Sequence, residues 1–443
     1  MASLSIPNRF SPTFHRTAVA LLFAMAVLSG VAEAQLVHEG KTAEHRAQSH
    51  NPSMLTLRDA REGSSPSNPL QFVSVAPCRV VDTRGPNGPF GGPPIQGGTF
   101  RSFPIPLSDC NISASAGAYV LTVTVIPNGR LSLLTVYPTG ESKGAVTTMV
   151  SLDGRIKSDP TIVPAGANGA VSVYASDTTN VVIDIAGYFA PASNSTLAFY
   201  PLPPCRVVDT RGPNGPLGGP YLPGGQERDF PVLESPCIPQ GLNPQAYSMN
   251  FTAVPHGPLN YLTVWPTGET LPMTFTLTDP TGTIVADAGI VTAGLNGAIS
   301  VYPSNDTDLV IDIDGFFAPP GPGGLSLYPT TAPCHAFDSR RSVFDPGFSM
   351  MIVAPVALPG NPCGLPSSAQ AFVFNATVYP PGPLGYLTLW ADGDIQPIVS
   401  NLNSLDGSVT SNMAIVPNSN GRTDAYASNT TLLALDILSY FAP

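Results

Sequence analysis

The sequence predicts an all-β protein of three tandem antiparallel β-sandwich domains, with either a jelly-roll or an immunoglobulin-like topology. Three observations lead to this prediction. One sequence pattern occurs three times with a period of roughly 130 residues, far above the roughly 20–50 residues of solenoid repeats. Short β-branched stretches alternate with turn signals in each copy, and no long helical period follows residue 34. The six cysteines are distributed two to a copy.

The three copies open and close on related motifs. The opening is Pro-Cys-Arg-Val-Val-Asp-Thr-Arg at residues 77–84 and 204–211, and Pro-Cys-His-Ala-Phe-Asp-Ser-Arg at 333–340. The closing is Gly-Tyr-Phe-Ala-Pro at 187–191, Gly-Phe-Phe-Ala-Pro at 315–319 and Ser-Tyr-Phe-Ala-Pro at 439–443. Copies of this length can each bury a core of their own. The predicted β-sandwich repeats span residues 70–191, 197–319 and 325–443.

The strands of each copy follow in a fixed order. In residues 119–126, Thr122 and Thr124 alternate with aliphatic side chains, which predicts a half-buried strand. Further β-rich stretches lie at 133–137, 170–174 and 181–185, with turn residues between them. The equivalent stretches are 247–254, 261–265, 298–302 and 309–313 in the second copy, and 372–379, 386–390 and 433–437 in the third.

The N-terminus resembles a secretory signal peptide at residues 1–34. Arg9 and Arg16 give a basic start, residues 18–28 are apolar, and Ala32-Glu33-Ala34 predicts cleavage before Gln35. The apolar run is shorter than the about 20 residues that span a bilayer. We therefore expect a secreted or cell-surface protein with no membrane span after signal removal, and a flexible polar leader at residues 35–69.

The cysteines are consistent with export. The repeat favours one disulfide inside each copy over a metal site, because the chain has no Cys-x-x-Cys motif or Cys/His cluster. A closed loop of about 30 residues stabilises a domain by roughly 3–4 kcal/mol in the chain-entropy model. The predicted disulfides are Cys78–Cys110, Cys205–Cys237 and Cys334–Cys363.

The formal net charge of −11, with only 11% charged residues, does not favour nucleic acid as a partner. No motif in the sequence indicates a bound metal or cofactor, and we expect neither. The partners we expect are extracellular polysaccharide or other surface proteins.

Acidic and basic residues recur at equivalent positions. Each opening motif holds an Asp-x-Arg pair, and each final strand holds an aspartate among aliphatic residues, where a carboxylate is costly unless paired. One interpretation is a structural ion pair, in which the arginine clamps the final strand to the first. The alternative is calcium held by Asp82 and Asp184, which a neighbouring arginine opposes. The residues are Asp82, Arg84 and Asp184; Asp209, Arg211 and Asp312; Asp338, Arg340 and Asp436.

Aromatic residues on one strand are the best candidates for ligand binding. Tyr261, Thr263 and Trp265 alternate with Leu262 and Val264, so they share one face of the strand. The third copy repeats the pattern with Tyr386, Thr388 and Trp390. Exposed aromatic rings could stack on sugar rings, whereas buried ones would fill or cover a core.

Together, the opening motif, the Tyr-Leu-Thr strand at 261–263 and 386–388 and the closing Asp-Ile-x-Gly-Tyr/Phe-Phe resemble a repeat of uncharacterised exported proteins of acidobacteria and actinobacteria. The resemblance covers residues 70–443 and implies export and a β-rich module, without an activity or ligand. Catalytic motifs such as Gly-x-Ser-x-Gly are absent from the sequence. The leading hypothesis is a non-catalytic surface or matrix protein acting in adhesion or structural interaction; a carbohydrate-binding protein is the alternative, and a hydrolase is a distant third.

Overall fold

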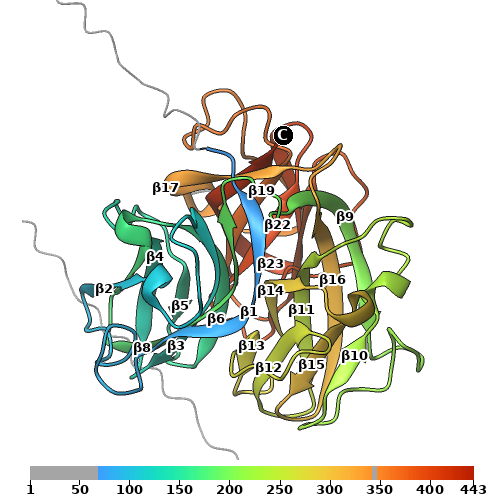
Figure 1. Cartoon of the computed structure of the whole chain (residues 1–443), viewed down its shortest axis with the longest axis horizontal. Helices are drawn as coiled ribbons and strands as arrows, with labels where there is room; N and C mark the ends of the chain where they lie inside the picture. The colour runs from blue at the N-terminus through green and yellow to red at the C-terminus, as the bar shows by residue number, and fades with distance from the viewer. Residues whose placement is uncertain (1–67, 342–346) are drawn as a thin grey trace, which may run out of the picture. The chain divides into compact units, whose positions relative to one another are not determined.

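The computed structural model describes residues 68–341 and 347–443, all within one compact unit, Arg61–Pro443. The predicted signal peptide at residues 1–34 lies outside the described residues, as does the predicted leader up to residue 67. The described residues form β-strands and five short 3-10 turns, which confirms the all-β prediction. Figure 1 colours the first repeat blue to green, the second green to yellow and the third orange to red.

Repeat 1 is a sandwich of two four-stranded antiparallel sheets, ordered β1-β8-β3-β6 and β2-β7-β4-β5. This strand order is that of a jelly roll, so the structure decides between the two topologies that the sequence left open. Val123 of β3 and Val173 of β7 pack in one core from opposite sheets. The strands are β1 Gln71–Asp82, β2 Thr99–Pro104, β3 Ala118–Pro127, β4 Leu131–Pro138, β5 Met149–Ser151, β6 Lys157–Pro164, β7 Ala170–Ala175 and β8 Thr179–Ala190, with turns η1 Ile105–Leu107 and η2 Ala167–Gly169.

Repeat 2 has the same topology, with sheets ordered β14-β11-β16-β9 and β10-β15-β12-β13. The Asn296-Gly297 pair before β15 forms a turn, in which Asn296 takes a φ of 55°. The strands are β9 Ala198–Asp209, β10 Arg228–Phe230, β11 Ala246–Pro255, β12 Leu259–Pro266, β13 Leu277–Asp279, β14 Val285–Thr292, β15 Ile299–Pro303 and β16 Thr307–Ala318, with turns η3 Val232–Glu234 and η4 Leu295–Gly297.

Repeat 3 differs in one strand. Its β23 runs without a break through the positions of β7 and β8 of repeat 1, so it pairs with β18 and β20 in its first half and with β17 and β19 in its second. One long strand thereby joins both sheets of the sandwich. The strands are β17 Ser326–Asp338, β18 Phe348–Pro355, β19 Ala371–Tyr379, β20 Leu384–Ala391, β21 Leu402–Ser404, β22 Thr410–Pro417 and β23 Arg422–Ala442, with turn η5 Ser339–Arg341.

The three predicted disulfides are all present. Each ties the first strand of its repeat to the segment that follows the second strand. The bonds are Cys78–Cys110, Cys205–Cys237 and Cys334–Cys363, and they use all six cysteines of the chain. Disulfides of this number are typical of proteins outside the reducing cytoplasm.

A fourth apolar core is shared by all three repeats. At its centre are Phe189, Phe317 and Phe441, one from the closing motif of each repeat. Their ring centroids lie 6.0, 6.1 and 6.3 Å apart, so the three rings form a nearly equilateral triangle. Each ring is at most 1% exposed. The closing motif therefore joins the repeats to one another as well as ending each sandwich.

Backbone hydrogen bonds close the ring of three repeats. Phe72 and Leu197 exchange two bonds of 2.9 and 2.8 Å, and Phe199 and Leu325 do the same. Leu70 and Leu327 exchange two more, of 2.9 and 2.7 Å, which link the first repeat to the third. Each repeat is thus paired with both of the others, and the three contacts between repeats are called junction 1/2, junction 2/3 and junction 3/1 below.

Candidate functional site

The recurring charged residues lie at the junctions between repeats. In repeat 1, the guanidinium of Arg79 donates two hydrogen bonds to Asp184, of 2.9 and 3.1 Å. Asp82 accepts two hydrogen bonds from the Arg84 guanidinium, of 2.8 and 2.6 Å, and its Oδ2 lies 3.8 Å from Nη1 of Arg79. Asp184 also accepts the backbone N–H of Phe275 in repeat 2, at 2.9 Å. The chain of ion pairs therefore ends on the neighbouring repeat.

This geometry corrects one part of the predicted ion pairs. The Asp-x-Arg pairs Asp82/Arg84, Asp209/Arg211 and Asp338/Arg340 are present, but these arginines bind their own aspartate in the turn after the strand. The aspartates of the final strand pair instead with the residue after the first cysteine: Asp184 with Arg79, Asp312 with Arg206 and Asp436 with His335. A register shift in β1 between Arg79 and Val81 helps to explain why simple alternation pointed to the wrong arginine.

The surroundings of Asp82 and Asp184 shift the pKa values of the two carboxyl groups in opposite directions. Hydrogen bonds from Arg84 lower the pKa of Asp82. Burial raises the pKa of Asp184, whereas the bonds from Arg79 and from the Phe275 N–H act in the opposite direction. Because Arg79 lies between the two carboxylates, its guanidinium occupies the place that a cation would need in the calcium interpretation.

Junction 3/1 replaces arginine with histidine. His335 contacts Asp436 through Nδ1 and Asp338 through Nε2, the latter at 2.9 Å. The hydrogen bond to Asp436, opposed by burial and supported by Asp338, raises the pKa of His335. Of the three junctions, this one therefore has a titratable imidazole in place of the guanidinium, and its two carboxylate partners favour the protonated form.

The predicted aromatic binding face is wrong for its inner residues. Trp265 and Trp390 are 0% and 1% exposed, and Thr263 and Thr388 are also buried. The segment after each strand folds back over this face: Trp265 Nε1 donates to the carbonyl of Glu269 at 3.0 Å, and Thr263 Oγ1 donates to the carbonyl of Thr274 at 2.6 Å. The tryptophans therefore fill space inside the protein and offer no platform for a sugar.

Only the tyrosines of that face reach the surface. Tyr261 is partly exposed and stacks beside Tyr302, with centroids 6.2 Å apart. Tyr386 is 36% exposed, and the centroid of its ring lies 5.6 Å from that of Tyr426.

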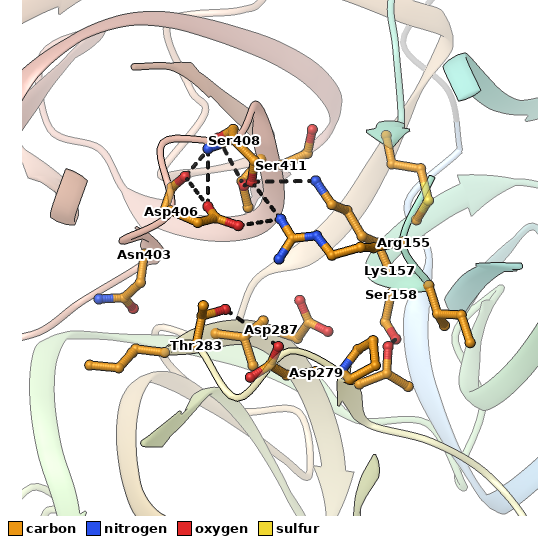
Figure 2. A pocket seen from close by; sticks show the side chains of 18 of the residues that line it. Arg155, Lys157, Ser158, Asp279, Thr283, Asp287, Asn403, Asp406, Ser408 and Ser411 are labelled. Atoms are coloured by element: carbon orange, nitrogen blue, oxygen red, sulfur yellow. Dashed lines mark hydrogen bonds and ion pairs between the residues drawn. The ribbon is translucent and has the colours of Figure 1, made fainter. Parts of the chain in front are cut away.

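A polar cluster joins all three repeats where β6, β14 and β22 meet. Figure 2 shows Arg155 and Lys157 of repeat 1 pointing toward Asp406 and Ser408 of repeat 3. Arg155 Nη1 also donates to Thr281 Oγ1 of repeat 2 at 3.0 Å. Although burial opposes it, the bond from Arg155 and the charge of Lys157 lower the pKa of Asp153 to about 2. The cavity beside this cluster, about 50 Å³, has room for little more than water.

Two buried carboxyl groups lie in the edge strands beside this cluster. Asp159 of β6 and Asp287 of β14 occupy the third position of their strands, where β22 has Asn412. The Asn412 amide spans two repeats, donating to Asn250 Oδ1 at 2.8 Å and accepting from the Ala288 N–H at 2.9 Å. Neither oxygen of Asp159 has a hydrogen-bond partner among the described residues. Burial raises the pKa of both aspartates well above the ordinary range, and Asp287 adds to the shift at Asp159.

One of the cavities at the junctions lies between repeats 2 and 3. It is a cavity of about 360 Å³, bounded by Arg206, Arg211 and Val254 of repeat 2 and by Tyr386, Ile398 and Ser400 of repeat 3. Its volume falls in the range of small-molecule sites. Of the predicted binding residues, Tyr386 alone lines it, and no sequence pattern pointed to Ser400 or Ile398.

No protein-family model matches the chain, and no curated protein matches it. The resemblance to exported bacterial repeats therefore stays a prediction. None of the helical segments within the described ranges is long and apolar enough to cross a membrane. In the same ranges, no group of three or more His, Cys, Asp or Glu side chains is placed to hold a metal ion.

Proposed function

We propose that this protein is an exported, non-catalytic component of the cell surface or its matrix, in which one chain holds three jelly-roll modules in fixed positions for adhesion or structural interaction. The observation that carries the proposal is the shared phenylalanine core, which fixes the modules to one another. Three disulfides support a role outside the cytoplasm. The recurring aspartates support it too, because Asp184 and Asp312 each accept a backbone N–H from the next repeat.

The test is fractionation of cells that make the tagged full chain, followed by an adhesion assay. We expect the mature protein in the extracellular or envelope-bound fraction, and we expect surfaces coated with it to retain producing cells or their matrix. A double variant, Phe317→Asp and Phe441→Asp, introduces charges into the shared core and should reduce retention. Recovery of the protein in the cytoplasm, or turnover of a polysaccharide or peptide substrate by the purified chain, would contradict the proposal.

Carbohydrate binding remains the second candidate because the tyrosine pairs at Tyr261 and Tyr386 are partly exposed. A glycan array with the full chain tests it directly. Saturable binding that is lost in a Tyr261→Ala, Tyr386→Ala double variant would support this candidate. Binding that the double variant retains would exclude these tyrosines as the sugar site.

A further inference from the structure

The three junctions are built on equivalent residues, so the side chains around the cavity at junction 2/3 can be compared with those at the other two junctions. At junction 1/2 the backbone N–H of Phe275 donates to Asp184, and at junction 2/3 the backbone N–H of Ser400 donates to Asp312 at 3.1 Å. Asp184 and Asp312 are the equivalent aspartates of β8 and β16. Phe275 and Ser400 therefore hold the same place, each on the neighbouring repeat.

At junction 1/2 this place is filled by an aromatic ring. The ring of Phe275 packs against the guanidinium of Arg79, whose Cζ lies 4.6 Å from the centroid of the ring. The centroids of the Phe275 and Tyr261 rings lie 5.1 Å apart. The cavity that remains beside Phe275 and Asp184 is about 40 Å³. Stacking of arginine on an aromatic face is favourable, most of all when it is partly desolvated.

At junction 3/1 a different residue provides the ring. Tyr379, near the end of β19, lies under the guanidinium of Arg340 at 4.1 Å. Its equivalent in repeat 2 is Val254, because Tyr379 and Val254 hold the same register against the final strands, opposite Leu432 and Asp308. Both filled junctions thus present an aromatic ring to an arginine of the opening motif.

Junction 2/3 has neither ring. It carries Ser400 where junction 1/2 has Phe275, and Val254 where junction 3/1 has Tyr379. Among the described residues, no aromatic ring lies over Arg206 or Arg211, and both arginines line the cavity of about 360 Å³. Ile398, 88% exposed, and Tyr386 form its apolar wall.

Charge narrows the chemistry of the occupant. Arg206 is bound to Asp312 at 2.9 and 3.2 Å, and Arg211 is bound to Asp209 at 2.7 and 2.6 Å. The two guanidinium charges are therefore balanced by two carboxylates, while their flat faces stay available for stacking. We propose that the cavity at junction 2/3 binds a small molecule with a neutral aromatic ring, which takes the place that Phe275 and Tyr379 fill in the other two junctions.

The test is titration of the full mature chain with 2-naphthol at pH 6, where this probe is neutral, followed by calorimetry and by fluorescence. We expect one saturable site per chain. Ser400→Phe copies Phe275 into the cavity and should weaken binding at least tenfold, whereas Ser400→Ala leaves the cavity open and should bind like the wild type. Val254→Tyr copies Tyr379 from the other side and serves as a second filling variant, should Ser400→Phe fold poorly.

Two further measurements complete the test. Phe275→Ser should open an equivalent space at junction 1/2 and raise the stoichiometry from one to two. The saturated analogue decahydro-2-naphthol should bind several-fold more weakly, because it lacks a π face. The proposal is overturned if 2-naphthol shows no saturable binding, if both filling variants bind like the wild type, or if the saturated analogue or methyl glucoside binds as well.

Discussion

Junctions 1/2 and 2/3 have the same polar contacts, but they differ in the side chain that packs beside these contacts. Both have an arginine after the first cysteine, a bidentate bond to the aspartate of the final strand and a backbone N–H from the next repeat. One is then closed by Phe275, and the other is left open at Ser400. The comparison teaches that the polar contacts set the position of neighbouring repeats, and that the apolar contacts around them are free to diverge.

The largest loss of stability should come from substituting the arginine that pairs with the aspartate of the final strand at each of these two junctions. Arg79→Ala and Arg206→Ala each leave a buried aspartate without its cation, which costs about 3–5 kcal/mol when a buried pair loses one partner. Asp184 and Asp312 are only 5% and 4% exposed at the side chain. Denaturant unfolding should show similar losses for the two variants. Losses below about 1 kcal/mol in either one would refute the shared role of these arginines.

The next largest effect on stability should come from Asp314, a buried carboxyl group at junction 2/3. Asp314 is buried where repeat 1 has Ala186, and burial raises its pKa to about 8. A raised pKa means that the folded state holds the proton longer than the unfolded state, so stability falls as the pH rises from about 4 to about 8. Asp314→Ala should therefore stabilise the protein by about 2–4 kcal/mol at pH 8 and by little at pH 4.

Thermal unfolding as a function of pH checks this prediction. Asp314→Asn is the matched control, because it keeps the size of the side chain and removes the titration. An Asp314→Ala variant with the same pH profile as the wild type would show that Asp314 ionises without cost.

The side chain at the position of Phe275 and Ser400 should have a smaller effect on the free energy of unfolding. Phe275→Ser removes a half-buried ring from junction 1/2 and should lower the free energy of unfolding by about 2 kcal/mol, less than for a fully buried phenylalanine. Ser400→Ala at junction 2/3 should change it by less than about 1 kcal/mol. Equal losses from both substitutions would contradict the difference in filling between the junctions.

The smallest effect concerns junction 3/1. The pKa of His335 is raised by Asp436, so its stabilising charge is fully present below about pH 6.5 and is lost as the pH rises through the folded-state value. His335→Arg restores the residue of the other two junctions. We expect it to add about 1 kcal/mol at a pH above the folded-state pKa of His335 and little at pH 5, as measured by urea unfolding over this pH range. A gain of the same size at pH 5 would argue against titration of His335.

The repeating pattern predicted the strands, the disulfides and the presence of paired aspartates, because each depends on spacing inside one copy. It did not predict what lies between copies. Alternation placed Thr122 and Thr124 on the face away from the core, but it could not show that other repeats cover this face. Whether Trp265 and Trp390 are exposed or buried stayed open in the sequence, because the segments that fold over them carry no periodic signal. His335, standing where the other copies have arginine, was the one available hint of the true ion pairs.

The most direct test of the account is differential scanning calorimetry of the full mature chain with its disulfides intact. If the shared core of Phe189, Phe317 and Phe441 unites the repeats, the chain should unfold in one transition whose calorimetric and van't Hoff enthalpies agree. Two or three separable transitions, each with the enthalpy of a single repeat, would contradict the claim that the three modules form one cooperative unit.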